Sequence, residues 1–69
     1  MSREIRVLDV VALTEDVADR GLRRGQVGTV VESLGSAVFE VEFVDNEGRT
    51  YATVPLDARQ LLVLHYQAA

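Results

Sequence analysis

The clearest pattern along the chain is an alternation of apolar and acidic side chains near its middle. Glu40 and Glu42 alternate with three apolar residues within positions 39–43. A period of two is typical of a β-strand with one buried and one solvated face. We therefore predict a strand over residues 37–44 that places both glutamates on its exposed face.

Two neighbouring segments also have the composition of strands, and turn sequences separate them from this one. Residues 26–32 are followed by a short connection at 33–36, which contains a glycine suited to positive φ. Residues 45–48 have Asp and Asn first and Gly last, as in a type I turn followed by a glycine bulge. We expect the next strand, at 49–54, to end at Pro55, because proline has no N–H to donate to a neighbouring strand.

Apolar runs near the two ends of the chain predict two more strands. Residues 5–13 are rich in β-branched side chains, and residues 61–65 form the second run. The loop after the first strand is expected to contain a short helical turn over residues 15–19, ended by Gly21. Residues 56–60 suit a single 3₁₀ turn that redirects the chain into the last strand.

Together these elements predict an all-β fold. Hairpins between the second, third and fourth strands, a longer first loop and a 3₁₀ turn before the last strand are typical of a small five-stranded SH3-like barrel. A ferredoxin-like fold needs two full helices, for which the sequence has no room. We therefore predict a single SH3-like β-barrel domain over residues 1–69.

Gly25 and Gly28 lie where the second strand is expected to begin. Glycine-rich segments bind phosphate when they open a helix, because the amides at a helix N-terminus point at the anion. Here the segment leads into a strand, and no Lys-Ser or Lys-Thr pair follows it. We therefore expect Gly25 to let the chain turn and Gly28 to allow close packing of the backbone.

Composition limits what can stabilise the domain. A chain of 69 residues has room for one small core, and such domains usually gain stability from disulfides, a metal ion or a partner chain. The sequence has no Cys and one His, which excludes a disulfide framework and a Cys/His zinc site. We expect no cofactor, and a partner chain remains as the source of added stability.

The net charge is −4, from 7 basic residues and 11 acidic ones. An acidic surface is repelled by nucleic-acid backbones and anionic membranes, and it favours a basic protein partner. No apolar run is long enough to span a membrane, and the start of the sequence lacks the apolar core of a signal peptide. We therefore expect a cytoplasmic protein.

Three arginines in the first loop, Arg20, Arg23 and Arg24, form the main basic group. Guanidinium groups this close can bind a carboxylate or phosphate through bidentate hydrogen bonds. The alternative is a solvated loop in which they pair with the acidic residues of the same loop. Both alternatives stay open at the level of sequence.

Glu40 and Glu42 form an acidic stripe, which Glu32 extends onto the neighbouring strand and Asp45 and Glu47 extend into the following turn. The stripe is either a solvated face or a docking surface for a basic protein. Metal binding is a third alternative, but hard cations need several oxygens that converge from a loop. Carboxylates along a flat strand diverge, so we expect no metal site.

The last strand carries a further candidate surface. If Leu62 and Leu64 point into the core, Leu61 and Val63 point outward, and an outward apolar pair on an edge strand suggests a covered edge or a homodimer interface. His65 follows these residues. Catalysis by His needs a nucleophile or carboxylate within hydrogen-bond reach, and the neighbouring sequence supplies neither. We therefore expect no enzymatic activity.

Five segments spread along nearly the whole chain carry a family resemblance. They are Asp9-Val10-Val11-Ala12-Leu13, Arg24-Gly25-Gln26-Val27-Gly28-Thr29-Val30-Val31, Phe39-Glu40-Val41-Glu42-Phe43, Thr50-Tyr51-Ala52 and Gln60-Leu61-Leu62-Val63-Leu64. In these segments the chain resembles a family of small bacterial stand-alone domains of unknown function. The resemblance implies an SH3-like barrel and a role as an antitoxin or accessory partner encoded beside another gene.

A second resemblance covers only the second and third strands. The Val-Gly-Thr-Val sequence is similar to the core of KOW domains of ribosomal and elongation proteins, and of small photosystem and ferredoxin-thioredoxin reductase subunits. The basic residues expected of an RNA-binding KOW segment are absent from it.

Two functional hypotheses follow. The first is a non-enzymatic protein-binding module that uses the acidic face of the third strand and the outward residues of the last one. The second is a nucleic-acid-binding domain in which the three arginines of the first loop contact phosphates and Tyr51 or Phe39 stacks on bases.

Overall fold

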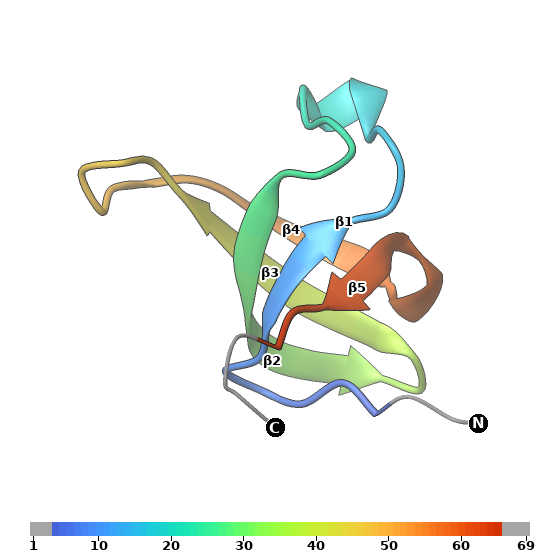
Figure 1. The fold of residues 1–69 in the computed structure, drawn as a ribbon. Coiled ribbons are helices and arrows are strands. Elements are labelled where there is room, and N and C mark those ends of the chain that lie inside the picture. Colours follow the sequence, from blue (N-terminus) through green and yellow to red (C-terminus); the bar gives the residue numbers. More distant parts are fainter. Residues whose placement is uncertain (1–3, 66–69) are drawn as a thin grey trace.

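The computed structural model describes residues 4–65 and contains five strands and two short 3₁₀ helices (Figure 1). Residues 1–3 and 66–69 of the predicted domain lie outside the described residues. The elements are β1 (Val10–Leu13), η1 (Ala18–Arg20), β2 (Val27–Gly35), β3 (Val38–Val44), β4 (Thr50–Asp57), η2 (Ala58–Gln60) and β5 (Leu61–Val63).

The strands form one antiparallel sheet in the order β4-β3-β2-β1-β5. β2, β3 and β4 follow one another as hairpins, whereas β1 pairs with β2 on one side and with β5 on the other. The sheet bends around a common interior (Figure 1). The predicted all-β fold, with five strands and a 3₁₀ turn before the last, is confirmed. In the described chain, hydrogen bonds do not close the barrel, because β4 and β5 are the two edges of the sheet.

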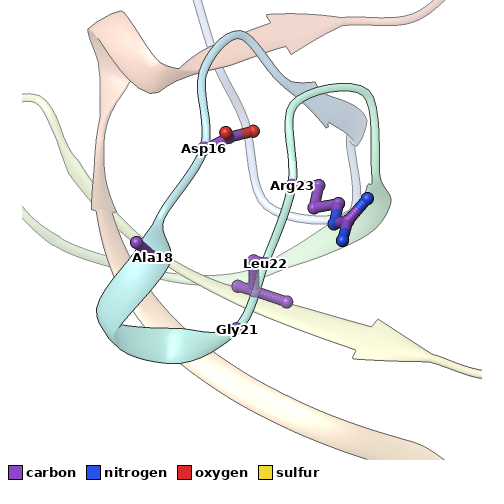
Figure 2. Close-up of a pocket in the computed structure, with 5 residues that line it drawn as sticks. All are labelled: Asp16, Ala18, Gly21, Leu22 and Arg23. Atoms are coloured by element: carbon purple, nitrogen blue, oxygen red, sulfur yellow. The ribbon is translucent and has the colours of Figure 1, made fainter.

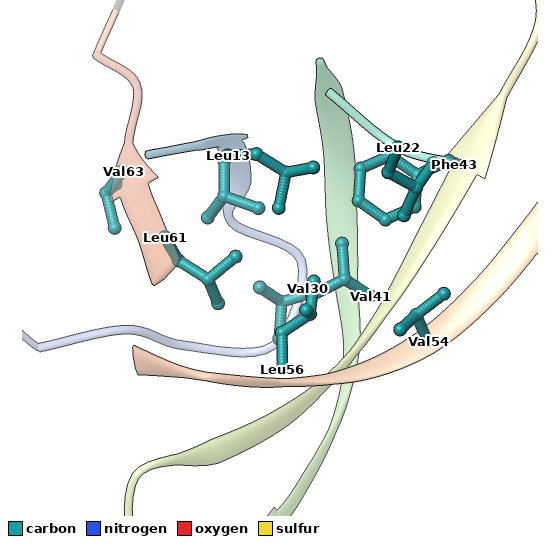
Figure 3. Close-up of a cluster of buried hydrophobic side chains, with 10 residues drawn as sticks. Leu13, Leu22, Val30, Val41, Phe43, Val54, Leu56, Leu61 and Val63 are labelled. Carbon is teal, nitrogen blue, oxygen red and sulfur yellow. The ribbon is translucent and has the colours of Figure 1, made fainter. Parts of the chain in front are cut away.

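Each strand contributes alternate residues to one apolar core (Figure 3). Phe43 is the largest of the fully buried side chains. Leu22 joins the core from the loop between β1 and β2, where Val17 and Leu22 form an isolated bridge. The buried residues are Val11, Leu13, Leu22, Val30, Val41, Phe43, Val54, Leu56, Leu61 and Val63.

Gly28 lies on the core side of β2, where β2 packs closely on β3. A Cβ at this position would lie 2.8 Å from the carbonyl oxygen of Glu42 and 2.8 Å from Val41 Cγ1. Gly25 has φ +92°, which lets the chain turn into β2. The predicted roles of both glycines are therefore confirmed.

The first strand is shorter than predicted. Residues 5–9 form a turn instead, in which the Arg6 N–H donates to the Asp9 carboxylate (2.8 Å) and the Asp9 N–H donates to the Arg6 carbonyl (3.0 Å). Leu8 has φ +81° within this turn, a conformation outside the β region. β1 therefore begins only at Val10.

The prediction that Pro55 ends the fourth strand is wrong. Pro55 lies within β4 opposite Glu40, and the strand continues to Asp57. β4 is an edge strand, so a residue without an N–H is tolerated there.

The two hairpin turns differ in how well the sequence predicts them. β2 continues to Gly35 and joins β3 through Ser36 and Ala37, which has φ +67°, so the predicted four-residue connection is wrong. The β3–β4 turn is confirmed, since Gly48 has φ +82° and the Asp45 carboxylate accepts hydrogen bonds from two backbone amides.

In the last strand, the residues that point into the core are not the predicted ones. Leu61 pairs with Leu13, and Val63 pairs with Val11. Residues paired across a sheet share a face, and Val11 and Leu13 point into the core. Leu61 and Val63 are therefore only 6% and 7% exposed, while Leu62 is 47% exposed. The prediction that Leu61 and Val63 point outward is wrong, and Leu62 takes that place.

Candidate binding surface

The side of the sheet that points away from the core, here called the outer face, carries the acidic stripe. Glu40 lies opposite Glu32 on β2, and Glu42 lies opposite Thr29 on the same strand. Both β3 glutamates are half-buried by their neighbours, and Glu32 is exposed. Glu42 accepts a hydrogen bond from the Thr50 hydroxyl (2.8 Å). We call Glu32, Glu40 and Glu42 the acidic row.

A bulge in β2 brings Glu32 opposite Glu40. Val30 pairs with Val41, but the next pair along the ladder is Glu32 with Glu40, so Val31 is an extra residue on β2. Val31 is 39% exposed as a result. The sequence predicts Glu32 near the stripe but does not show that it lies opposite Glu40. A bulge changes the register of a strand without leaving a hydrophobic pattern.

An apolar part of the outer face lies on the neighbouring strands. Ala12 of β1 pairs with Val27 of β2 on one side and with Leu62 of β5 on the other. Val27 and Leu62 are 48% and 47% exposed, and Ala12 is half-buried between them. We call these three residues the apolar row. The apolar row was not predicted from the sequence. Val27 is next to the inward Gly28, and this position indicates that Val27 points to the outer face.

The three arginines of the first loop lie around η1. Asp16 does not pair with a guanidinium, since its Oδ1 accepts a hydrogen bond from the backbone N–H of Arg24 (2.8 Å). Within residues 4–65, none of Arg20, Arg23 and Arg24 forms an ion pair. The loop is thus ordered by backbone contacts, and the guanidinium groups are left to solvent.

A hollow of about 290 Å³ lies at this loop (Figure 2). It is lined by Asp16, Ala18, Gly21, Leu22 and Arg23. Gly21 ends η1 in the left-handed conformation, with φ +69°, which confirms the predicted end of the helical turn. The hollow thus brings one predicted basic residue, Arg23, beside the Asp16 carboxylate without an ion pair between them.

Tyr51 is connected to the arginine loop. The Gln26 side chain accepts a hydrogen bond from the Arg23 N–H and donates one to the Tyr51 hydroxyl (2.8 Å). Tyr51 is half exposed, and its ring centroid lies 6.3 Å from that of Phe43. Phe39, the other predicted stacking residue, packs instead against the core.

A second hollow, of about 480 Å³, lies at η2 and is lined by Glu15, Asp57, Arg59 and Gln60. These residues hold one another in place. Asp57 and Gln60 form a capping box, and the Gln60 side chain donates to Glu15 (3.3 Å). The backbone hydrogen bond from Arg59 lowers the pKa of Asp57. The hollow is therefore lined by groups that are already hydrogen-bonded to one another or to the backbone of η2.

Metal binding and membrane crossing can also be assessed for residues 4–65. No group of three metal-ligating side chains is close enough together there to hold an ion. Neither of the short helices in this part of the chain has the length or the apolar character of a membrane crossing.

Fold and surface together define a small all-β domain with one core and an outer sheet face of mixed acidic and apolar character. The model of the family described as Domain of unknown function (DUF4926) matches residues 7–63. The chain therefore belongs to this family. No curated protein and no solved structure matches the chain significantly.

Proposed function

We propose that this domain is a non-enzymatic protein-binding module with an SH3-like barrel, acting in the bacterial cytoplasm as an antitoxin or accessory subunit of a neighbouring gene product. One observation carries the proposal. The outer face of the sheet combines exposed apolar side chains with an acidic row that has no ion pair within the described residues.

The energetics of a small domain support a partner. A chain of this size buries only about 60% of its unfolded surface, so its own stability is small. Val27 and Leu62 leave nearly half of their surface in water although they sit on a regular sheet. Covering them with a partner would add the burial that the core cannot supply.

The polar hollow at η2 favours binding over catalysis. Asp57 and Gln60 are engaged in capping and Glu15 accepts a hydrogen bond from Gln60, whereas a catalytic acid or base must be free to reach a substrate proton. Asp57 remains ionised as the cap of η2, which suits a structural role.

Co-purification from the native host at low salt tests the proposal. A tagged chain is expected to retain a specific protein, and Leu62→Asp is expected to release it. The control is Asn46→Asp, which adds the same charge in the exposed turn between β3 and β4, outside the strands that form this face. A monomer that retains no protein under these conditions would contradict the proposal.

Nucleic-acid binding is the second candidate, and one observation favours it. Hydrogen bonds through Gln26 connect the hydroxyl of the exposed Tyr51 to the backbone of Arg23, so an aromatic ring and a loop arginine are linked, as in sites that combine phosphate contacts with stacking. The logarithm of the affinity for a single-stranded oligonucleotide should then fall linearly with the logarithm of salt concentration. Absence of any binding at low salt would exclude this function.

A further inference from the structure

The outer face of the sheet has two chemically different halves that lie side by side. The apolar row crosses β2, β1 and β5, and the acidic row lies on β2 and β3. Thr29 joins them, since it pairs with Val10 of β1 and with Glu42 of β3. Neighbouring strands lie about 4.8 Å apart, so β5 and β3 are separated by about 14 Å across the sheet, and Glu32 lies about 16 Å beyond Val27 along β2. One short segment of a partner can therefore contact both halves.

The acidic half of the outer face destabilises the free domain. Like charges directly opposite each other on neighbouring strands are destabilising, and Glu32 lies directly opposite Glu40. None of the five strands contains a basic residue. The described arginines that do form ion pairs use carboxylates outside this row. The repulsion between the two glutamates is thus not relieved within residues 4–65.

Arrangements that break a local rule of stability are expected where a protein binds something. A guanidinium or ammonium group placed between Glu32 and Glu40 would convert the repulsion into two charge-assisted contacts. A partner that supplies it must also supply apolar side chains, because Val27 and Leu62 are exposed beside the acidic row.

We infer that the outer face binds a protein segment that carries apolar side chains next to Lys or Arg, with the apolar groups on Ala12, Val27 and Leu62 and a cation between Glu32 and Glu40. This inference rests on the proposed function and specifies the chemistry of its partner. A second copy that met this surface with its own outer face would lack this chemistry, since it would bring the same acidic row and no strand arginines to the interface.

Synthetic peptides of about ten residues, long enough to cross the sheet, provide the probe. The first has an apolar half of Val followed by a charged half of Arg (Arg-Val), the second a Val half followed by a Glu half (Glu-Val), and the third a Ser half followed by an Arg half (Arg-Ser). The Arg-Val peptide is expected to bind and to shift the amide resonances of Ala12, Leu62 and Glu40. The Arg-Ser peptide should bind at least about tenfold more weakly, and the Glu-Val peptide should not bind.

Variants locate the site. Leu62→Ser and Glu40→Gln should each weaken Arg-Val binding by about tenfold, whereas the controls Asn46→Ser and Glu47→Gln, both in the turn between β3 and β4, should leave it unchanged. Glu40→Gln should also raise the urea midpoint of the free domain, which shows that weaker binding does not come from unfolding. The inference is overturned if all four variants bind the Arg-Val peptide with equal affinity. It is also overturned if the resonance shifts are confined to the arginine loop.

Two further outcomes separate this inference from the proposed function. If the domain captures a host protein but the Arg-Val peptide does not bind, the inference fails and the protein-binding function stands. If sedimentation shows a dimer that Leu62→Ser dissociates, a second copy occupies the face and the inference is overturned.

Discussion

The two faces of this sheet contrast in how closely their sequence follows the rules of stability. The inner face is uniformly apolar and tightly packed, and even the single glycine on it has no room for a methyl group. The outer face combines exposed valine and leucine side chains with two glutamates directly opposite each other. The inner face therefore serves folding, whereas the outer face carries costs that the proposed binding role accounts for.

The strongest test of this contrast uses neighbouring leucines of β5. Leu61→Ala should destabilise the domain by about 2–5 kcal/mol, because it opens a cavity in the core. Leu62→Ala, one residue later on the outer face, should change stability by less than about 0.5 kcal/mol. Urea unfolding measures both, and similar losses for the two variants would mean that the phase of β5 is wrong.

A smaller effect is expected from crowding the inner face of β2. Gly28→Ala should cost about 1–3 kcal/mol, since the new methyl group meets the Glu42 carbonyl and the Val41 side chain. Val27→Ala, on the opposite face, serves as the control and should change stability by less than about 0.5 kcal/mol. A neutral Gly28→Ala would show that β2 and β3 pack less closely than described.

On the outer face, a substitution should instead stabilise the domain. Glu32→Arg replaces the opposed carboxylates with an ion pair to Glu40, which should raise the free energy of unfolding by about 0.2–1 kcal/mol at low salt. The gain should shrink when salt is added. Unfolding at two ionic strengths tests this, and a loss of stability would show that the two side chains do not interact.

The smallest expected effect is a loss of stability at low pH. It comes from carboxylates in turns rather than from either face of the sheet. Backbone hydrogen bonds from Arg49 and Glu47 lower the pKa of Asp45, and one from Arg59 lowers that of Asp57. Both carboxylates therefore contribute stability above the usual Asp pKa, and that stability is lost as pH falls through the lowered values. An Asp45→Asn/Asp57→Asn variant should lose less stability than wild type between neutral pH and about pH 3, as followed by urea midpoints.

The contrast between faces also explains what the sequence could predict. β3 was placed with the correct phase because its acidic and apolar residues alternate. β5 was placed with the wrong phase because residues 61–64 are all apolar, and a run without alternation does not show which residues point inward. Only the pairing of β5 with β1 fixes its orientation.

The remaining errors have a similar origin in tertiary context. Pro55 ends a strand in general but is accepted at a sheet edge, and the edge position of β4 depends on the order of all five strands. The bulge at Val31, which brings Glu32 opposite Glu40, depends on how β2 bends around the core. The candidate surface was therefore predictable on β3 and had to be seen in the structure on β1, β2 and β5.

The pairing of β1 with β5 also has a consequence for the order of folding. The hairpins of β2, β3 and β4 join segments that are close in sequence, so they can form early and quickly. β5 reaches β1 from the other end of the described chain, where the Leu64 N–H donates to the Val10 carbonyl (2.9 Å). Since Leu61 and Val63 complete the core, a growing chain keeps its apolar interior open until these residues have been synthesised and have left the ribosome exit tunnel.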